Sequence, residues 1–179
     1  MRGLIVGRFQ PFHLGHESAV MEVLSQCEEI VIAIGSAQYS HTQENPFTAS
    51  ERYEMIYAAM QDRNLQGRVH IVPVNDIHQN VLWVQHVRST VPSFAVIYTN
   101  NPLTARLFRE AGYEVGETRI YSREKYSGTI IREKMLKGGE WKDSVSNAVL
   151  LKIEEFDGVR RIRDIYSPSR TETTDVRNR

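Results

Sequence analysis

His13 and His16 stand three positions apart near the start of the chain, with Gly15 between them. The apolar residues 4–6 predict a buried strand just before them, and the residues that follow predict the start of a helix. In an open α/β sheet, ligands bind beyond the carboxyl ends of strands, where helix N-termini present free N–H groups. The imidazoles would add N–H donors, and Gly15 would let a phosphate approach the backbone. Such a pair alone is more often structural or part of a metal site, but the strand, loop and helix start together favour an anion site.

Two further groups of donors extend this prediction. Arg8, in the loop before the histidines, is a charged and bidentate donor. Far along the chain, Ser127 stands at a predicted helix start, Thr129 in the first turn and Arg132 about one turn further on. By itself this pattern is more often a capped helix with a surface arginine. Paired with the histidine element, it favours a site where hydroxyl, N–H and guanidinium donors converge on one phosphate.

The elements that must position these residues alternate along the chain. Short apolar, β-branched runs at residues 4–6, 30–34, 69–74 and 95–98 are each followed by a loop and a segment of helical character. This alternation predicts an α/β fold with a parallel sheet and helices on both faces.

Several helix ends carry their own signals. We expect a last amphipathic helix at about residues 145–156, one domain over residues 1–166, and a polar, mobile tail over residues 167–179. The other signals are a capping box at Thr48 and Glu51, Pro102 and Gly112 at the two ends of a helix, and Ser127 and Gly138 at the two ends of another.

Composition narrows the class of protein. The 22 basic and 22 acidic side chains among 179 residues cancel, so no global field would draw the chain to nucleic acid or to an anionic membrane. Cys27 is the single cysteine, which excludes an intrachain disulfide and a Cys-rich zinc site and fits a small hydrophobe on a helix in a reducing compartment. No apolar run has the length of a signal peptide core or a membrane span, so a cytoplasmic protein is expected.

Residues 7–16 read Gly-Arg-Phe-Gln-Pro-Phe-His-Leu-Gly-His. With the Ser127, Thr129 and Arg132 pattern, this string resembles the HxGH nucleotidyltransferase superfamily, and within it the archaeal-type nicotinamide mononucleotide (NMN) adenylyltransferases. The resemblance covers roughly the first 140 residues and is weak in the tail. It continues through residues 34–38, 45–52, 73–77, 82–84, 101–103 and 126–129.

The resemblance implies a Rossmann-like, three-layer αβα fold with a central parallel sheet and a small C-terminal helical region. It also implies adenylyl transfer from ATP to NMN, giving NAD and pyrophosphate, by a homo-oligomer that is expected to be a hexamer. The catalytic residues it implies are His13, His16 and Arg132. The ATP-binding residues are Gly7, Arg8, Phe9, Gln10, Gly15, Asn101, Arg123, Ser127 and Thr129, and the NMN-binding residues are Gly35, Ser36, Asp76, Asn80 and Trp83.

The acceptor must be recognised outside the phosphate motifs. If the helix after the third strand starts early enough, Asp76, Asn80 and Trp83 fall on neighbouring helical faces. NMN carries a cationic pyridinium ring, on which Trp83 could stack, and a carboxamide, which Asp76 or Asn80 could pair. Without the resemblance, a core aromatic would be the better interpretation of Trp83.

One position departs from the expected pattern. Relatives are expected to carry a basic residue before Asn45, where it could hold the acceptor phosphate, but this chain has Glu44. Either Glu44 points to solvent, or nearby cations supply enough positive charge; these are Arg8, Arg123, Lys125 and Arg132, and His41 could reach the same side of the site.

The implied mechanism is in-line attack of the acceptor's 5′-phosphate on the α-phosphorus of ATP. A phosphate monoester with a second pKa of ~6 is already largely an anion at neutral pH, so no general base is needed. Mg²⁺ is expected on the ATP phosphates, because no carboxylate cluster suggests a protein metal site.

Two alternative functions remain open. One is transfer to another small phosphate acceptor, such as phosphopantetheine or, with CTP as the donor, glycerol phosphate. The other is a nucleotide-binding module without turnover. A tRNA-charging enzyme would need a longer chain.

Overall fold

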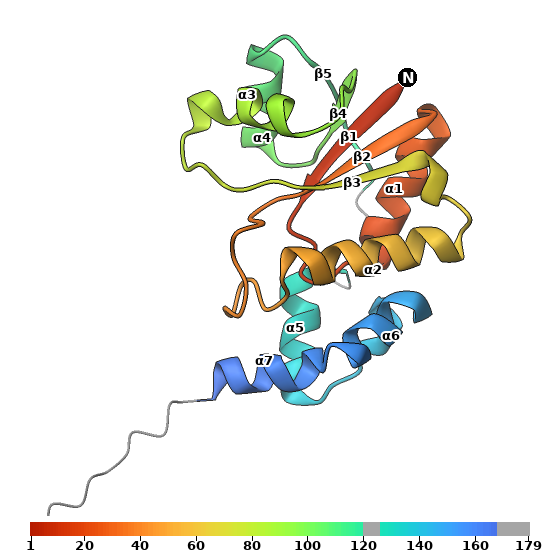
Figure 1. Ribbon diagram of the computed structural model, residues 1–179, viewed down its shortest axis with the longest axis vertical. Helices are drawn as coiled ribbons and strands as arrows, with labels where there is room; N and C mark the ends of the chain where they lie inside the picture. The colour runs from red at the N-terminus through yellow and green to blue at the C-terminus, as the bar shows by residue number, and fades with distance from the viewer. Residues whose placement is uncertain (120–125, 168–179) are drawn as a thin grey trace, which may run out of the picture.

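The computed structural model describes residues 1–119 and 126–167, and its centre is a sheet of five parallel strands (Figure 1). β1 pairs with β2 from Arg2 opposite Glu29 to Gly7 opposite Ile34, and it pairs with β4 on its other edge. The chain therefore leaves β1 first toward β2 and later returns to β4, which creates a crevice beyond the end of β1. The strands lie in the order β3 (Val69–Pro73), β2 (Glu29–Ile34), β1 (Arg2–Gly7), β4 (Val96–Tyr98) and β5 (Glu114–Gly116).

Helices cover both faces of this sheet. α1 (Leu14–Gln26) and α2 (Ala49–Asp62) pack on one face, and α3 (Asn80–Thr90) and α4 (Pro102–Glu110) pack on the other. The C-terminal region consists of α5 (Gly128–Lys137), α6 (Asn147–Glu155) and α7 (Gly158–Tyr166), on the α2 side of the molecule (Figure 1). Short 3₁₀ turns span Gln66–Arg68 and Lys142–Ser144.

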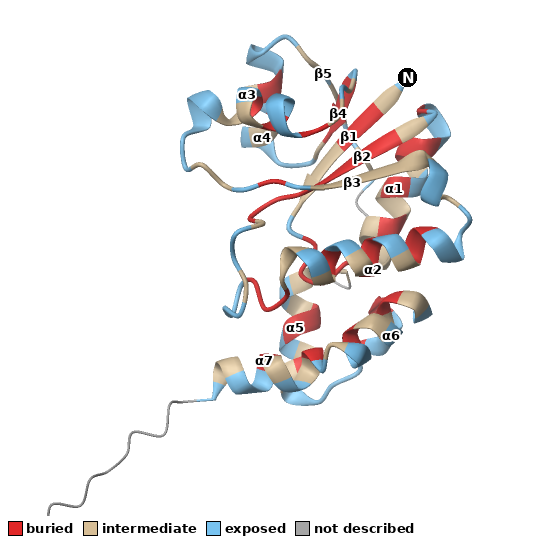
Figure 2. Ribbon diagram, in the orientation of Figure 1, coloured by how far each residue is buried: buried red, intermediate tan, exposed pale blue. Residues whose placement is uncertain are grey.

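The central strand β2 shows how the sequence builds these layers. Ile30, Ile32 and Ile34 belong to the core under α1 and α2, whereas Val31 and Ala33 belong to the core under α3 and α4. Successive side chains of a strand point to opposite faces, so a continuous apolar run is buried on both sides (Figure 2). The predicted Rossmann-like α/β class is confirmed.

The predicted helix ends are found. The capping box of α2 is complete, because Glu51 N donates to Thr48 Oγ1 at 3.2 Å and Thr48 N donates to Glu51 Oε2 at 2.9 Å. Pro102 opens α4, and Gly112 and Gly138, with φ of 83° and 73°, follow the ends of α4 and α5 in the left-handed conformation that glycine adopts most easily.

Two elements were not predicted. β5 has the sequence Glu-Val-Gly and is only half-buried, so no apolar run marks it. The helix predicted at about residues 145–156 ends at Glu155, and a second helix, α7, follows it. Asp157 separates the two in a left-handed conformation, with φ of 51°, for which the sequence carries no glycine signal.

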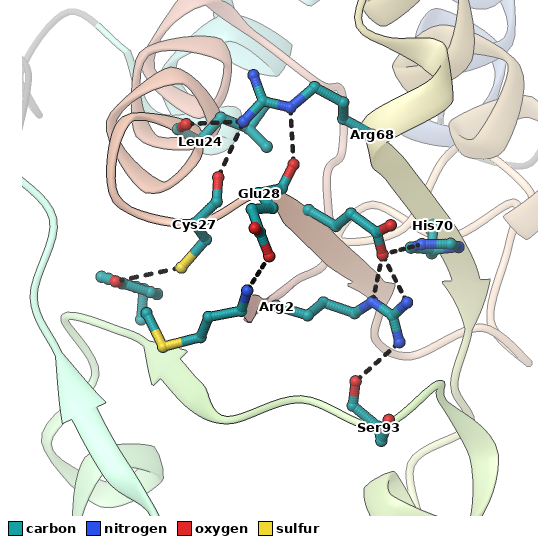
Figure 3. A network of polar contacts seen from close by, with 10 residues as sticks. Arg2, Leu24, Cys27, Glu28, Arg68, His70 and Ser93 are labelled. Atoms are coloured by element: carbon teal, nitrogen blue, oxygen red, sulfur yellow. Dashed lines mark hydrogen bonds and ion pairs between the residues drawn. The ribbon is translucent and has the colours of Figure 1, made fainter.

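Polar contacts join the amino-terminal ends of the strands, whereas the predicted site lies beyond their carboxyl-terminal ends (Figure 3). Arg2 Nε donates to Glu29 Oε2 at 2.8 Å, His70 Nε2 lies 2.9 Å from the same oxygen, and Arg2 also donates to the Ser93 carbonyl. Hydrogen bonding to His70 and Arg2 lowers the pKa of Glu29 below its usual value. Arg68 completes the network by donating to the carbonyl groups of Leu24, Cys27 and Glu28.

A single apolar cluster runs from the sheet into the C-terminal helices and includes Ile32, Met55 and Ile162. The prediction of one domain over residues 1–166 stays a prediction. Most of the predicted tail, residues 168–179, lies outside the described residues. In the two described ranges, no helix combines the length and apolar character that crossing a membrane requires.

Candidate active site

His13 is the N-cap residue of α1, directly beyond the end of β1. Its Nδ1 accepts a hydrogen bond from the backbone N–H of His16 at 3.3 Å, and its carbonyl accepts from the N–H groups of His16 and Glu17. A neutral imidazole has one acceptor nitrogen and one donor nitrogen. Since Nδ1 is the acceptor, the proton of His13 is on Nε2.

The ring of His16 lies in an aromatic stack. Its centroid is 3.5 Å from that of His13, 5.5 Å from that of Phe12 and 4.8 Å from that of Phe9, which meets it edge-on. Nδ1 of His16 is enclosed and has no hydrogen-bond partner among the described residues. Nε2 is therefore the ring nitrogen that can reach a ligand in the cavity that His16 lines.

Both histidines are neutral at physiological pH. Burial lowers the pKa of His13 to about 4, against the weaker opposing effect of a backbone hydrogen bond. Burial, and then the charge of His13, lowers the pKa of His16 well below 6.5. The pair thus offers two N–H donors without positive charge.

A cavity of about 550 Å³ opens beside these histidines, between the carboxyl ends of β1 and β4 and the start of α5. Of the predicted residues, His13, Gly15, His16, Asn101 and Ser127 line it. Ser127 occupies the N-cap position of α5, but its side chain makes no capping bond with a described residue, so its hydroxyl can serve a ligand. The other lining residues are Ile5, Val6, Ala19, Tyr98, Thr99, Asn100, Pro102, Thr118, Arg119, Tyr126 and Gly128. We call this space the nucleotide cavity.

A second cavity, of about 410 Å³, adjoins the first and shares Val6, Thr99 and Asn101 with it. We call it the acceptor cavity. Besides the shared Asn101, five of its lining residues are predicted ligands, namely Gly7 and Arg8 for ATP and Asp76, Asn80 and Trp83 for NMN. The remainder are Ile77, His78, Gln79, Leu103, Thr104 and Leu107.

Asp76 reaches the acceptor cavity from a loop. α3 begins only at Asn80, so the early helix start that would place Asp76 on a helical face beside Asn80 is not found, whereas Asn80 and Trp83 both belong to α3. Instead, Asp76 accepts hydrogen bonds from Ser36 N at 3.2 Å and from Ser36 Oγ at 2.7 Å. The Gln38 side chain pairs with both the N–H and the carbonyl of Asp76. Two loops that are distant in sequence therefore hold the carboxylate in place.

Two predicted ATP-binding residues, Phe9 and Gln10, and the predicted catalytic residue Arg132 have partners within the protein. Phe9 is 2% exposed and packs under His16, and Gln10 is 3% exposed and uses its amide on both backbone groups of Phe47. Arg132 is 7% exposed and donates to the carbonyls of Gln10 at 2.8 Å and Gln43 at 3.1 Å. The side chains of Phe9 and Gln10 thus serve packing and loop support, and contacts of these two residues with ATP stay predictions. A contact of Arg132 with phosphate stays a prediction.

The remaining residues that the sequence analysis singles out lie outside the two cavities or outside the described residues. Glu44 is exposed, which favours the interpretation that it points to solvent. Gly35 and Ser36 do not line the acceptor cavity, but Gly35 N donates to the Gly7 carbonyl and Ser36 Oγ donates to Asp76, and both Gly7 and Asp76 line it. Thr129 is within 3.5 Å of Arg132. Arg123 and Lys125 lie outside the described residues.

The sequence analysis missed several residues of the site. Thr99 and Asn100 follow β4 and Thr118 and Arg119 follow β5, so they lie where a parallel sheet binds ligands. The end of β4 could have been identified by this rule, whereas β5 has no sequence signal. Within residues 1–119 and 126–167, no three His, Cys, Asp or Glu side chains group closely enough to hold a metal ion.

Comparison with known proteins identifies the family. A family model described as cytidylyltransferase-like matches residues 4–134. The chain is 52% identical over 169 residues to a nicotinamide-nucleotide adenylyltransferase of Archaeoglobus fulgidus, covering 92% of this chain and 97% of that relative. It is 49% identical to one of Picrophilus torridus, with the same coverage of both chains. The chain belongs to the nicotinamide-nucleotide adenylyltransferase family.

The solved structures agree with this adenylyltransferase assignment. A bifunctional NMN adenylyltransferase/ADP ribose pyrophosphatase from Francisella tularensis, complexed with AMP and a manganese ion, matches with a TM-score of 0.78 and 25% identity. The match covers 92% of this chain and 51% of that one, so the chain spans about half of the two-function protein. The predicted resemblance to the adenylyltransferases is confirmed, and so is the class of enzyme, a nucleotidyltransferase that uses ATP.

Proposed function

We propose that this chain joins ATP and NMN to form NAD and pyrophosphate at the junction of the nucleotide and acceptor cavities. The observation that carries the proposal is that the two cavities share Val6, near the end of β1, and Thr99 and Asn101, which follow β4. ATP in one cavity and NMN in the other would place the α-phosphorus and the attacking phosphate together, and such positioning is the main catalytic device in phosphoryl transfer.

On the ATP side, His13 and His16 face the α-phosphate. Each would donate one hydrogen bond from Nε2, and these bonds would strengthen as negative charge develops in the pentavalent transition state. Because both rings are neutral, each can donate its hydrogen bond without first binding a second proton that would have to be released later. The departing pyrophosphate would lie at the N-terminus of α5, where the Ser127 hydroxyl and the free N–H groups of the first turn accept an anion.

On the acceptor side, the chemistry of the lining suits NMN. Trp83 supplies an aromatic face for the pyridinium ring, and Asp76 and Asn80 can pair the carboxamide. Arg8 is exposed and lines the same cavity, so it can contact the acceptor phosphate. That phosphate is largely ionised above its second pKa of ~6 and attacks without a general base.

Mg²⁺ fits this site as a partner of the nucleotide rather than of the protein. The described residues offer no group of carboxylates for it, whereas ATP phosphates and water provide the oxygen ligands that Mg²⁺ prefers. When bound, it would neutralise charge on the β- and γ-phosphates.

The proposal also includes a homo-oligomeric state, expected to be a hexamer, and a cytoplasmic location. Light scattering would test the first, and cell fractionation would test the second.

A panel of acceptors tests the proposal. Purified protein is incubated with ATP, Mg²⁺ and one acceptor at a time, and NAD is detected by coupled reduction while pyrophosphate is measured independently. We expect pyrophosphate and NAD with NMN, and loss of both with EDTA. Pyrophosphate formation with phosphopantetheine or glycerol phosphate but not with NMN would assign a different acceptor. Ligand-dependent stabilisation without pyrophosphate would indicate a binding module.

A further inference from the structure

α7 contributes no lining residue to either cavity. It is joined to α2 by an ion pair that consists of two hydrogen bonds. Arg161 Nη1 lies 2.6 Å from Glu51 Oε2, and Arg161 Nη2 lies 2.7 Å from Glu51 Oε1. The side chains are only 21% and 15% exposed, so solvent screens the pair weakly. Hydrogen bonding from Arg161 and from Thr48 lowers the pKa of Glu51 in spite of its burial.

Glu51 is also the third residue of α2 and completes its capping box with Thr48. The oxygen that accepts from Arg161 Nη1 is the same one that accepts from Thr48 N, so Arg161 fixes the start of the helix. The next residue, Arg52, donates from Nε to the Thr48 carbonyl at 3.1 Å. The position of the Arg52 side chain therefore depends on how α2 begins.

Arg52 joins the two loops that build the acceptor cavity. It is fully buried, and its Nη1 donates to the carbonyls of Arg8 and Gly35, both at 2.9 Å, while Nη2 donates to that of Ser36 at 3.2 Å. Burial lowers its pKa to about 10, which leaves it charged, and Asp76 and Glu51 oppose this shift. Since Ser36 holds Asp76, the guanidinium sets the spacing between the Arg8 loop and the Asp76 carboxylate.

α7 reaches the Arg8 loop by a second route. Gly158 packs so closely on Phe47 that a Cβ at this position would lie 2.7 Å from the Phe47 ring. The backbone of Phe47 is held on both sides by the Gln10 amide, two residues after Arg8. The same helix therefore supports the acceptor cavity through an ion pair and through packing.

We propose that Arg161 is a positioning residue for the acceptor: through Glu51 and Arg52 it sets the distance between Arg8 and Asp76, which contact opposite ends of NMN. This inference rests on the proposed function. It requires that disturbing Arg161 affects KM for NMN more than KM for ATP, because Arg52 donates to the carbonyls of Arg8, Gly35 and Ser36, and none of these residues belongs to the histidine stack. If the ion pair were merely structural, its loss would lower stability without changing KM for NMN more than KM for ATP.

The test compares Arg161→Met with Arg160→Met, an adjacent position on α7 whose side chain is 76% exposed and whose nearest carboxylates are 3.9 Å away. Steady-state kinetics are measured with each substrate varied, well below the melting temperature of every variant. We expect Arg161→Met to raise KM for NMN about tenfold, the scale on which sub-ångström misplacement acts, with KM for ATP within about twofold of wild type. Arg160→Met should match wild type, and Arg161→Lys, which retains charge but not the two-bond geometry, should fall between them.

A double-mutant cycle shows whether Arg161 acts through Glu51. If it does, Arg161→Met with Glu51→Gln should lose no more in kcat/KM for NMN than the worse single variant. Equal changes in both KM values, additive losses, or Arg161→Met behaving like Arg160→Met would each overturn the proposal. If Arg161→Met does not fold, Arg161→Lys and Glu51→Gln carry the same comparison. Absence of NAD from wild type would instead contradict the proposed function.

Discussion

The imidazole of His13 stacks on that of His16, with their centroids 3.5 Å apart and their planes inclined by 18°. Two protonated rings could not occupy this arrangement without strong repulsion, and burial already disfavours the charged form of each. The stack therefore favours a pair of neutral histidines, whose Nε2 atoms are the donors in the proposed function.

Replacing His16 with Ala should lower kcat for NAD formation by about 100-fold or more, because one donor to the transition state is lost. KM for ATP should change far less. His70→Ala, at the opposite edge of the sheet, is the matched histidine control and should keep the wild-type kcat. An unchanged kcat in His16→Ala would remove His16 from this role.

The buried histidines should make stability fall in mild acid. The pKa of His13 is about 4 in the folded protein and near 6.5 when unfolded, so between these values the unfolded chain binds the extra proton. The contribution of His13 to stability is fully present above pH 6.5 and is lost as the pH falls toward 4, by about 2 kcal/mol at pH 5.

Urea unfolding at pH 7 and pH 5 measures this effect. Carboxylates also titrate in acid, so the control is His13→Gln, which cannot gain the proton and should show a smaller loss between the two pH values. An identical loss in wild type and His13→Gln would contradict the low pKa of His13.

Trp83→Ala should raise KM for NMN about tenfold, since a cation–π contact in a partly desolvated site contributes on the order of 1–2 kcal/mol. Trp83→Phe should retain much of the affinity. Leu82→Ala, the neighbouring exposed position of α3, should resemble wild type. If Trp83→Ala lowered only the melting temperature and left KM unchanged, Trp83 would be a packing residue rather than a ligand.

Gly158→Ala should lower the free energy of unfolding by roughly 1–3 kcal/mol, the usual cost of overpacking. Its Cβ would meet the fully buried Phe47 ring at 2.7 Å. At Gly67 a Cβ would meet nothing within 4 Å, so Gly67→Ala should change stability little. Denaturant titration of the two variants checks the difference, and equal stabilities would show that α7 can shift away from Phe47.

Glu44→Gln should leave KM for NMN within about twofold of wild type, because exposed charges contribute little after solvent screening. Glu44 is exposed, although its charge still acts on Arg132. Kinetics at low and high salt would detect any residual repulsion of the acceptor phosphate. A large improvement in KM would mean that the carboxylate turns inward when NMN binds.

Local signals in the sequence account for much of the fold and for the class of reaction. The apolar runs mark the first four strands, and Thr48, Pro102 and Gly138 mark helix ends because each acts within one or two turns of its own position. The string at residues 7–16 places His13 and His16 at a helix start beyond a strand, and the structure confirms that placement.

Only the tertiary structure decided which side chains were available to the ligands. Gln10 and Arg132 have the residue types of phosphate ligands, yet Gln10 is used on Phe47 and Arg132 on the carbonyls of Gln10 and Gln43. Neutrality of the histidines depends on burial, which no local pattern specifies. Arg52 and Arg161 resemble ordinary surface cations of helices until their partners are known.

The physical reason is the range of each effect. Capping, turn formation and apolar periodicity depend on neighbours along the chain, so the sequence by itself determined the first four strands, most helix ends and the His-x-Gly-His element. Hydrogen-bond partners and pKa shifts depend on groups brought together across the fold, such as Ser36 with Asp76 and Glu51 with Arg161. The tertiary structure alone therefore decided how the acceptor cavity is supported.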